Sequence, residues 1–367
     1  MKIELQNDPL ESWIGKKGEP VIISGPCSAE SPQQVLDTAQ ALASSGKVHL
    51  LRAGIWKPRT RPGSFQGVGT QGLSWLKAAG DAVGLPVITE VANAHHVEAC
   101  LEHRIDALWI GARTTVNPFS VQEIADALKG VSIPVLVKNP INPDLALWIG
   151  ALERMDQAGI KHLGAIHRGF SSYNNRHYRN APNWEIPIEL KTLVPGLPIF
   201  CDPSHISGRR DGIHEVAQKA LDLDMEGLMI ESHIQPDAAL SDAQQQLAPD
   251  TLSQVLESLQ FRSSKPVDQQ FDSQLEMFRS RIDEIDQLLV SKLAERMGIV
   301  EEIGAYKHEN NLTILQLERW REILATRTDW ASRQDLDTTF IRSLLKVIHE
   351  ASIARQTQVM NRPPVND

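Results

Sequence analysis

The run PVIIS, residues 20–24, is short, apolar and β-branched, and seven runs of the same kind follow it at a steady interval. They are HLLRA (49–53), PVITE (86–90), ALWIG (107–111), PVLVK (134–138), HLGAIH (162–167), PIFCD (198–202) and GLMIE (227–231). Stretches of helical character separate them, such as 31–46 and 120–130, each opening with Ser and closing with Gly. Eight strand–helix units in roughly 250 residues predict an α/β fold, the (β/α)8 TIM barrel. A doubly wound open sheet is less favoured, because the repetition is even and no Gly-rich dinucleotide fingerprint occurs.

Charged or metal-binding residues follow all eight runs. In chain order they are Cys27, Arg52 with Lys57, Glu90, Arg113, Lys138, His167 with Arg168, Asp202 with His205, and Glu231. Barrel enzymes build their sites where the strands end, at the C-terminal face of the barrel. We therefore expect these side chains to meet at one mouth.

A basic cluster stands out in a chain whose net charge is −9. The stretch LRAGIWKPRTRPGSF, residues 50–64, carries Arg52, Lys57, Arg59 and Arg61. An acidic chain with one local cluster argues against general nucleic-acid binding, which needs a broad basic field. Six cations are expected around the mouth: Arg52, Lys57, Arg59, Arg113, Lys138 and Arg168. Such a cage suits a small ligand that carries phosphate and carboxylate groups.

A thiolate, an imidazole and two carboxylates form a second constellation after strands one, seven and eight: Cys27, His205, Glu231 and Asp242. These strands are neighbours where a barrel closes, so the four side chains can meet. Mixed sulfur, nitrogen and oxygen donors suit a divalent ion of the Mn, Fe, Co or Zn type better than Mg or Ca.

The chain lacks the marks of export. Its first residues, MKIELQNDPLESW, hold no apolar signal core, and no run reaches the ~18 apolar residues of a membrane span. Three scattered cysteines do not make a disulfide framework. We expect a cytoplasmic protein that does not bind membranes.

The pattern changes near residues 262–270, and three regions are predicted: a barrel over 1–262, a linker over 263–270 and a small all-helical domain over 271–367. Apolar residues then recur at steps of three and four: Leu275, Phe278, Ile282, Ile285, Leu289 and Leu293. One amphipathic helix to about residue 307 would be ~55 Å long, too long to bury its stripe within so small a monomeric domain. Two more helices are expected, at 316–326 and 335–360. A homodimer that pairs the long helices would cover the stripe.

Seven motifs of the first region resemble those of 3-deoxy-D-arabino-heptulosonate 7-phosphate (DAHP) synthases of the type I-beta group. They are GPCS (25–28), KPRT (57–60), IGAR (110–113), VKNP (137–140), HRG (167–169), DPSH (202–205) and SDAQQQL (241–247). KPRT separates this group from octulosonate-phosphate synthases, which have Ala and Asn after the Lys. The resemblance implies a metal-dependent condensation of phosphoenolpyruvate with erythrose 4-phosphate, the first step toward aromatic amino acids.

The same resemblance assigns roles to the residues of the mouth. Phosphoenolpyruvate would contact Arg52, Lys57, Glu90, Arg113, Lys138 and Arg168. Erythrose 4-phosphate would contact Arg59 and Thr60, and Cys27, His205, Glu231 and Asp242 would hold the metal. Lys57 would be catalytic, either as a general acid toward the new alkoxide or as an electrostatic partner. Arg61 has no role in the resemblance.

The second region, over roughly 271–360, resembles the all-helical chorismate mutases through LEMFRSRIDEID (275–286) and LVSKLAERMGIVEEIGAYK (289–307). The resemblance implies that chorismate or prephenate contacts Arg279 of the partner subunit, and Arg296, Lys307, Arg319, Ser352 and Gln356, with Arg296, Lys307 and Gln356 catalytic. Gln316 and Trp320 depart from the family, which often has acidic residues there, one of them meeting the substrate hydroxyl. Two alternatives stay open: a ligand-binding regulatory module with little turnover, and a dimerisation device with incidental charge.

Overall fold

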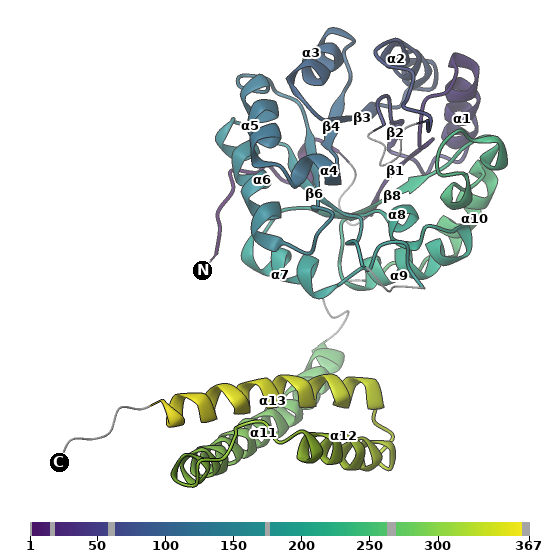
Figure 1. Cartoon of the computed structure of the whole chain (residues 1–367). Coiled ribbons are helices and arrows are strands. Elements are labelled where there is room, and N and C mark those ends of the chain that lie inside the picture. The colour runs from purple at the N-terminus through teal and green to yellow at the C-terminus, as the bar shows by residue number, and fades with distance from the viewer. Residues whose placement is uncertain (1, 15–18, 58–62, 173–176, 263–268, 362–367) are drawn as a thin grey trace. The chain divides into compact units, whose positions relative to one another are not determined.

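The structure, a computed structural model, describes residues 2–14, 19–57, 63–172, 177–262 and 269–361 (Figure 1). It divides into two compact units, Met1–Ser264 and Lys265–Asp367. Six residues of the predicted linker, 263–268, lie outside the described residues, and the next residue, Gln269, already begins a helix. Within the described residues, no helix combines the length and the apolar character that a membrane crossing needs.

The first unit is a closed barrel of eight parallel strands, so the predicted fold is confirmed (Figure 1). The strands are β1 (Val21–Gly25), β2 (Leu50–Arg52), β3 (Val87–Val91), β4 (Ala107–Ile110), β5 (Val135–Lys138), β6 (Leu163–His167), β7 (Ile199–Cys201) and β8 (Gly227–Glu231). Each lies within or overlaps one of the eight apolar runs. The barrel closes between β1 and β8, from Val21 opposite Gly227 to Gly25 opposite Glu231.

Helices surround the strands. They are α1 (Pro32–Ser44), α2 (Gln71–Val83), α3 (Ala94–Glu102), α4 (Ala112–Thr115), α5 (Pro118–Ala127), α6 (Leu145–Gln157), α7 (Glu185–Leu193), α8 (Pro203–Ser207), α9 (Ile213–Asp222) and α10 (Pro249–Ser258). Ser31 caps α1 as expected, since its side chain accepts a hydrogen bond from the Gln34 amide. The expected Ser120 start of α5 is wrong. The helix begins two residues earlier, because Asn117 accepts two amide hydrogen bonds and Pro118 suits the first helical position.

Two apolar clusters stabilise the barrel, one on each face of the sheet. The larger cluster fills the space between strands and helices. The smaller one has a fully or nearly buried centre made of strand residues alone: Val21, Ile23, Leu50, Ile88, Ala107, Trp109, Leu136, Ile166, Phe200 and Met229. Because side chains alternate along a strand, these residues face the barrel interior and the intervening ones face the helices.

The second unit consists of α11 (Gln269–Glu309), α12 (Leu317–Ser332) and α13 (Thr338–Met360), with α11 and α12 both packed against α13 (Figure 1). The 41 residues of α11 make a rod of ~62 Å. Its apolar stripe is not covered by the described residues of the helical unit: Ile282, Ile285 and Leu289 are each 57% exposed. The three expected helices are therefore present, with α12 six residues longer at its C-terminal end than predicted.

Candidate active site at the barrel mouth

Strand alternation explains which side chains reach the mouth. Six polar residues each follow an interior apolar residue by two positions, so they continue the interior face beyond the last apolar layer. They are Arg52, Glu90, Lys138, Arg168, Asp202 and Glu231. His167 has the opposite parity. Its ring packs against Trp148 and Trp184 and it is fully buried, so it belongs to the layer between strands and helices rather than to the mouth.

Arg52 is a buried cation, and two of its hydrogen-bond donors have no partner within the described residues. Its side chain is 1% exposed, and Nη2 lies 3.1 Å from Oε1 of the equally buried Glu231. The guanidinium carbon lies 4.8 Å from the centre of the Trp109 ring. Within the described residues, Nε and Nη1 have no hydrogen-bond partner. Buried donors are almost always paired, so these two point to a ligand that accepts a forked hydrogen bond.

Lys138 also lies over the Trp109 ring. Its Nζ is 5.6 Å from the Trp109 ring centre and 2.7 Å from Oδ2 of Asp202. Burial would raise the pKa of Asp202, but the nearby His205 and Lys138 charges hold it well below its usual range. Asp202 is thus an anion that holds the Lys138 side chain in place.

Glu90 and two further arginines complete the described part of the cage. Trp109 Nε1 donates to Glu90 Oε2 at 2.9 Å, which fixes the carboxylate. Burial lowers the pKa of Arg168 to about 10, and repulsion from Arg179 and Arg113 contributes to the same shift. Arg168, Arg113 and Arg179 are therefore close enough for their positive charges to interact. The expected aldehyde-substrate residues Arg59 and Thr60, and Arg61 beside them, lie outside the described residues.

Three of the four predicted metal ligands meet beside this cage. The ligand atoms of Cys27, Glu231 and Asp242 all lie within 4.8 Å of one another. The Cys27 thiol is 3.4 Å from Asp242 Oδ2, and His205 Nε2 is 4.0 Å from Glu231 Oε1. His205 Nδ1 faces Asp202 Oδ2 at 2.9 Å, which leaves Nε2 as the nitrogen that can coordinate.

The donor set fits a divalent cation. Burial, together with the charge of Glu231, raises the pKa of the Cys27 thiol to about 12. A buried thiol between two carboxylates is unfavourable as a thiolate, and a bound cation reverses this because coordination deprotonates the sulfur. Lys57 stands at the same point, with Nζ 3.1 Å from the Cys27 sulfur. The cation cage and the metal ligands therefore share one mouth.

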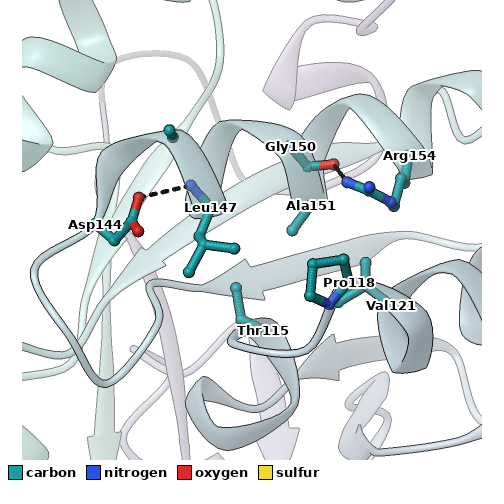
Figure 2. Close-up of a pocket in the computed structure, with 9 residues that line it drawn as sticks. Thr115, Pro118, Val121, Asp144, Leu147, Gly150, Ala151 and Arg154 are labelled. Carbon is teal, nitrogen blue, oxygen red and sulfur yellow. Dashed lines mark hydrogen bonds between the residues drawn. The ribbon is translucent and has the colours of Figure 1, made fainter.

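A separate cavity of about 390 Å³ opens between α5 and α6 (Figure 2). Asp144 and Arg154 supply its charges, but both are already engaged in their own helix. Asp144 caps α6 by accepting from the Leu147 amide, and Arg154 donates to the Gly150 carbonyl (Figure 2). Nothing at this cavity matches the donors that converge at the barrel mouth.

The helical unit gathers four predicted residues within one chain. Arg296 Nη1 donates to the Ser352 hydroxyl at 2.7 Å, and Lys307 Nζ donates to the Ile314 carbonyl at 2.6 Å. Ser352, Lys307 and Gln356 are all buried. Gly304, one turn before Lys307, lets α11 approach α13, because a Cβ there would lie 3.3 Å from Gln356. Gln356 Oε1 has no partner within the described residues.

Two other predicted residues do not join this group within one chain. Arg279 pairs with Glu276, and Arg319 pairs with Glu322 at 2.6 Å. All four side chains are more than half exposed. The spacing of seventeen residues along α11 puts Arg279 and Arg296 on different faces of that helix.

Residues 1–265 match the family model described as the DAHP synthetase I family. The chain belongs to the DAHP synthetase I family. Residues 278–357 match the model described as chorismate mutase type II, so this DAHP synthetase I chain carries a chorismate mutase type II domain at its C-terminal end. Both resemblances drawn from the motifs are confirmed.

Similarity to individual proteins supports the family match. A phospho-2-dehydro-3-deoxyheptonate aldolase of Thermotoga maritima is 33% identical over 226 residues, which cover 62% of this chain and 64% of the relative. A 2-dehydro-3-deoxyphosphooctonate aldolase of Legionella pneumophila is 27% identical, over 65% of this chain and 89% of the relative. The crystal structure of a Thermotoga maritima DAHP synthase matches with a TM-score of 0.59 and 30% identity, covering 66% of this chain and 68% of that one.

The predicted metal ligands of this DAHP synthetase I chain have supporting partners that the sequence reasoning missed. Gln245 Nε2 donates to Glu231 Oε2 at 2.7 Å, and Gln246 Oε1 accepts from the Cys27 amide at 2.9 Å. Arg179 Nη1 donates to Asp242 Oδ1 at 2.9 Å. The SDAQQQL motif contained the two glutamines, but no sequence signal marked Arg179. These contacts orient ligands, as partners of metal sites commonly do.

Proposed function

We propose that the barrel condenses phosphoenolpyruvate with erythrose 4-phosphate to give DAHP and phosphate. The observation that carries the proposal is Arg52, a buried arginine with two unpartnered donors, beside Lys138 and within reach of a cluster of metal-ligating side chains. A ligand with phosphate and carboxylate groups satisfies those donors. Family membership supports the same reaction.

Different side chains would bind the two substrates. Arg52, Lys57, Arg113, Lys138 and Arg168 would hold the phosphate and carboxylate of phosphoenolpyruvate, with Glu90 close by. Arg59 and Thr60 would hold the aldose phosphate. A divalent cation of the Mn, Fe, Co or Zn type, bound by Cys27, His205, Glu231 and Asp242, would supply Lewis acidity toward the aldehyde.

The bond changes are those of an aldol-type condensation followed by loss of phosphate. C3 of phosphoenolpyruvate forms a bond to the aldehyde carbon, water adds at C2, and phosphate leaves. Lys57 is suited to protonate the new alkoxide, because its ammonium group lies 3.1 Å from the Cys27 sulfur, next to the metal ligands.

Carbon counting separates the two products suggested by the relatives. A heptulosonate needs a four-carbon aldehyde in addition to phosphoenolpyruvate, whereas an octulosonate needs five carbons. KPRT, residues 57–60, favours the four-carbon substrate. The test is loss of phosphoenolpyruvate in the presence of Mn²⁺ with erythrose 4-phosphate or arabinose 5-phosphate. Faster loss with arabinose 5-phosphate would contradict the proposal.

Two variants test the site. Lys57→Met is expected to lower turnover at least 100-fold, the scale of a lost acid–base group. Lys47→Met is the control, because Lys47 pairs with Glu257 on the surface, away from the mouth. Full activity of metal-free Cys27→Ala would contradict the role of the metal.

We further propose that the helical unit converts chorismate to prephenate and forms a homodimer through α11. Arg296, Lys307 and Gln356 would bind the dianionic substrate, with Ser352 holding Arg296. The rearrangement needs no covalent group, only a compact conformer and positive charge at the breaking C–O bond. The exposed stripe of α11 supports pairing with a second copy, whose Arg279 would complete each pocket.

Mixing the purified chain with chorismate and following prephenate tests this activity. Turnover that Arg296→Ala abolishes supports a bifunctional enzyme. Tight binding of prephenate without turnover, together with inhibition of phosphoenolpyruvate consumption, would instead support the regulatory module. An Arg296→Ala variant that changes neither turnover nor inhibition would contradict both and leave the dimerisation device.

A further inference from the structure

Trp320, which stands where an acidic residue was expected, has a defined partner. Its ring stacks on His349, with ring centroids 4.0 Å apart and planes inclined by 7°. Trp320 comes from α12 and His349 from α13, so the stack joins two helices.

His349 lies on the ligand-facing side of α13. Ser352 and Gln356 follow it by three and seven residues, which places all three on one face of the helix. That face is the one that Arg296 reaches, since its Nη1 donates to the Ser352 hydroxyl at 2.7 Å. His349 therefore borders the pocket proposed for the dicarboxylate.

The charges around His349 come from two helices. Arg296 and Lys307 of α11 act against protonation of the imidazole, and Glu350 of α13 favours it. Trp320 of α12 contributes a ring without charge. Burial and the two cations together lower the pKa of His349. The acceptors that engage the cations, the Ser352 hydroxyl and the Ile314 carbonyl, are neutral, so neither contact supplies a counter-charge to Arg296 or Lys307.

We propose that His349, held against Trp320, is a positioning residue of this pocket and that binding of a dicarboxylate is coupled to uptake of one proton on its imidazole. The inference rests on the proposed ligand of the helical unit. Two carboxylates paired with Arg296 and Lys307 remove the repulsion that keeps the ring neutral. The Trp320 face then favours the imidazolium, because a cation over an indole ring is attracted by its quadrupole. The protonated ring donates to the ligand.

Proton linkage determines whether the affinity for the dicarboxylate rises or falls with pH. The pKa of His349 is below its ordinary value in the free protein and higher in the complex. Between these two values the complex binds more protons than its components, so affinity rises as pH falls, by about tenfold per pH unit at most. A carboxylate in the place of Trp320 would act in the opposite direction, since its own protonation at low pH would weaken binding.

The test is isothermal titration of the full chain with prephenate between pH 5.5 and 8, in two buffers of different ionisation enthalpy. The difference in heat between the buffers counts protons taken up. We expect uptake approaching one proton for the wild type and none for His349→Phe, which keeps a stacking ring but cannot titrate. His308→Phe, at an exposed position of α11, is expected to behave as the wild type.

The outcomes separate this inference from the proposed function. Wild-type binding without proton uptake would overturn the inference and leave the function of the helical unit intact. Equal proton uptake by wild type and His349→Phe would overturn it in the same way. Failure of both chorismate and prephenate to bind at any pH would overturn both. The wild-type proton count needs no variant, so misfolding of His349→Phe does not remove the test.

Discussion

Gln245 is the residue whose replacement tests the metal site most directly. Its Nε2 donates to Glu231 Oε2 at 2.7 Å, and both side chains are essentially inaccessible to water. Gln245→Leu keeps much of the volume and removes the donor. A hydrogen bond to a charged group contributes about 1.5–3 kcal/mol. Loss of a partner of a metal ligand typically weakens metal binding about 10- to 100-fold, which is ~1.4–2.8 kcal/mol. The free energy of the hydrogen bond and that of the expected loss of metal affinity therefore agree.

The assay is competition between the purified chain and a chromophoric chelator for Mn²⁺ or Zn²⁺. Gln245→Leu is expected to raise the metal Kd about 10- to 100-fold. Gln244→Leu is the matched control, because Gln244 is the exposed neighbour in the same motif, and its Kd should equal that of the wild type. Thermal unfolding of both variants checks that they fold. An unchanged Kd for folded Gln245→Leu would refute the argument that this contact orients Glu231 for a metal.

Three further predictions concern the barrel. Lys138→Met should lower the free energy of unfolding in urea by about 3–5 kcal/mol, because it leaves the buried carboxylate of Asp202 without its 2.7 Å partner; an unchanged value would contradict this. Burial lowers the pKa of His167 to about 3, whereas an unfolded chain titrates near 6.5. Above pH ~6.5 the ring is neutral in both states, so its titration costs no stability. As pH falls toward 3, the unfolded chain binds a proton that the folded chain does not, and the free energy of unfolding drops, by about 2 kcal/mol at pH 5. His167→Phe should remove this part of the pH dependence of unfolding, and an unchanged slope would contradict the prediction. Gly111→Ala places a Cβ 2.2 Å from Glu90 Oε1, so Glu90 must move, and kcat/KM for phosphoenolpyruvate should fall on the order of 10- to 100-fold; Gly298→Ala, at a helical position of α11 where an added Cβ has open space, should leave it unchanged.

Much of the fold follows from local patterns. The eight apolar runs became the eight strands, because short β-branched runs between helical segments are typical of buried parallel strands. The mouth residues followed too, since a polar residue directly after such a run lies at the C-terminal end of the barrel. Parity along each strand then separates Arg168, which faces the interior, from His167, which faces Trp148.

Contacts between residues far apart in the chain could not be predicted from local sequence patterns. Cys27 and Asp242 are 215 residues apart, and their 3.4 Å approach depends on closure between β1 and β8. Arg179 belongs to none of the motifs, and it pairs with Asp242 across a sequence separation of 63 residues. Gln244 and Gln245 are identical in type, yet only Gln245 is buried against Glu231.

The sequence alone thus determined the elements, the two-part organisation of the chain and the chemical types at the barrel mouth, because periodicity and strand ends are local properties. Only the tertiary structure decided which of those groups touch: Lys57 on the Cys27 sulfur, Gln245 on Glu231, and His349 on Trp320. The physical reason is that hydrogen bonding and stacking act over about 3–4 Å. Such contacts depend on the packing of whole elements, which no single segment specifies.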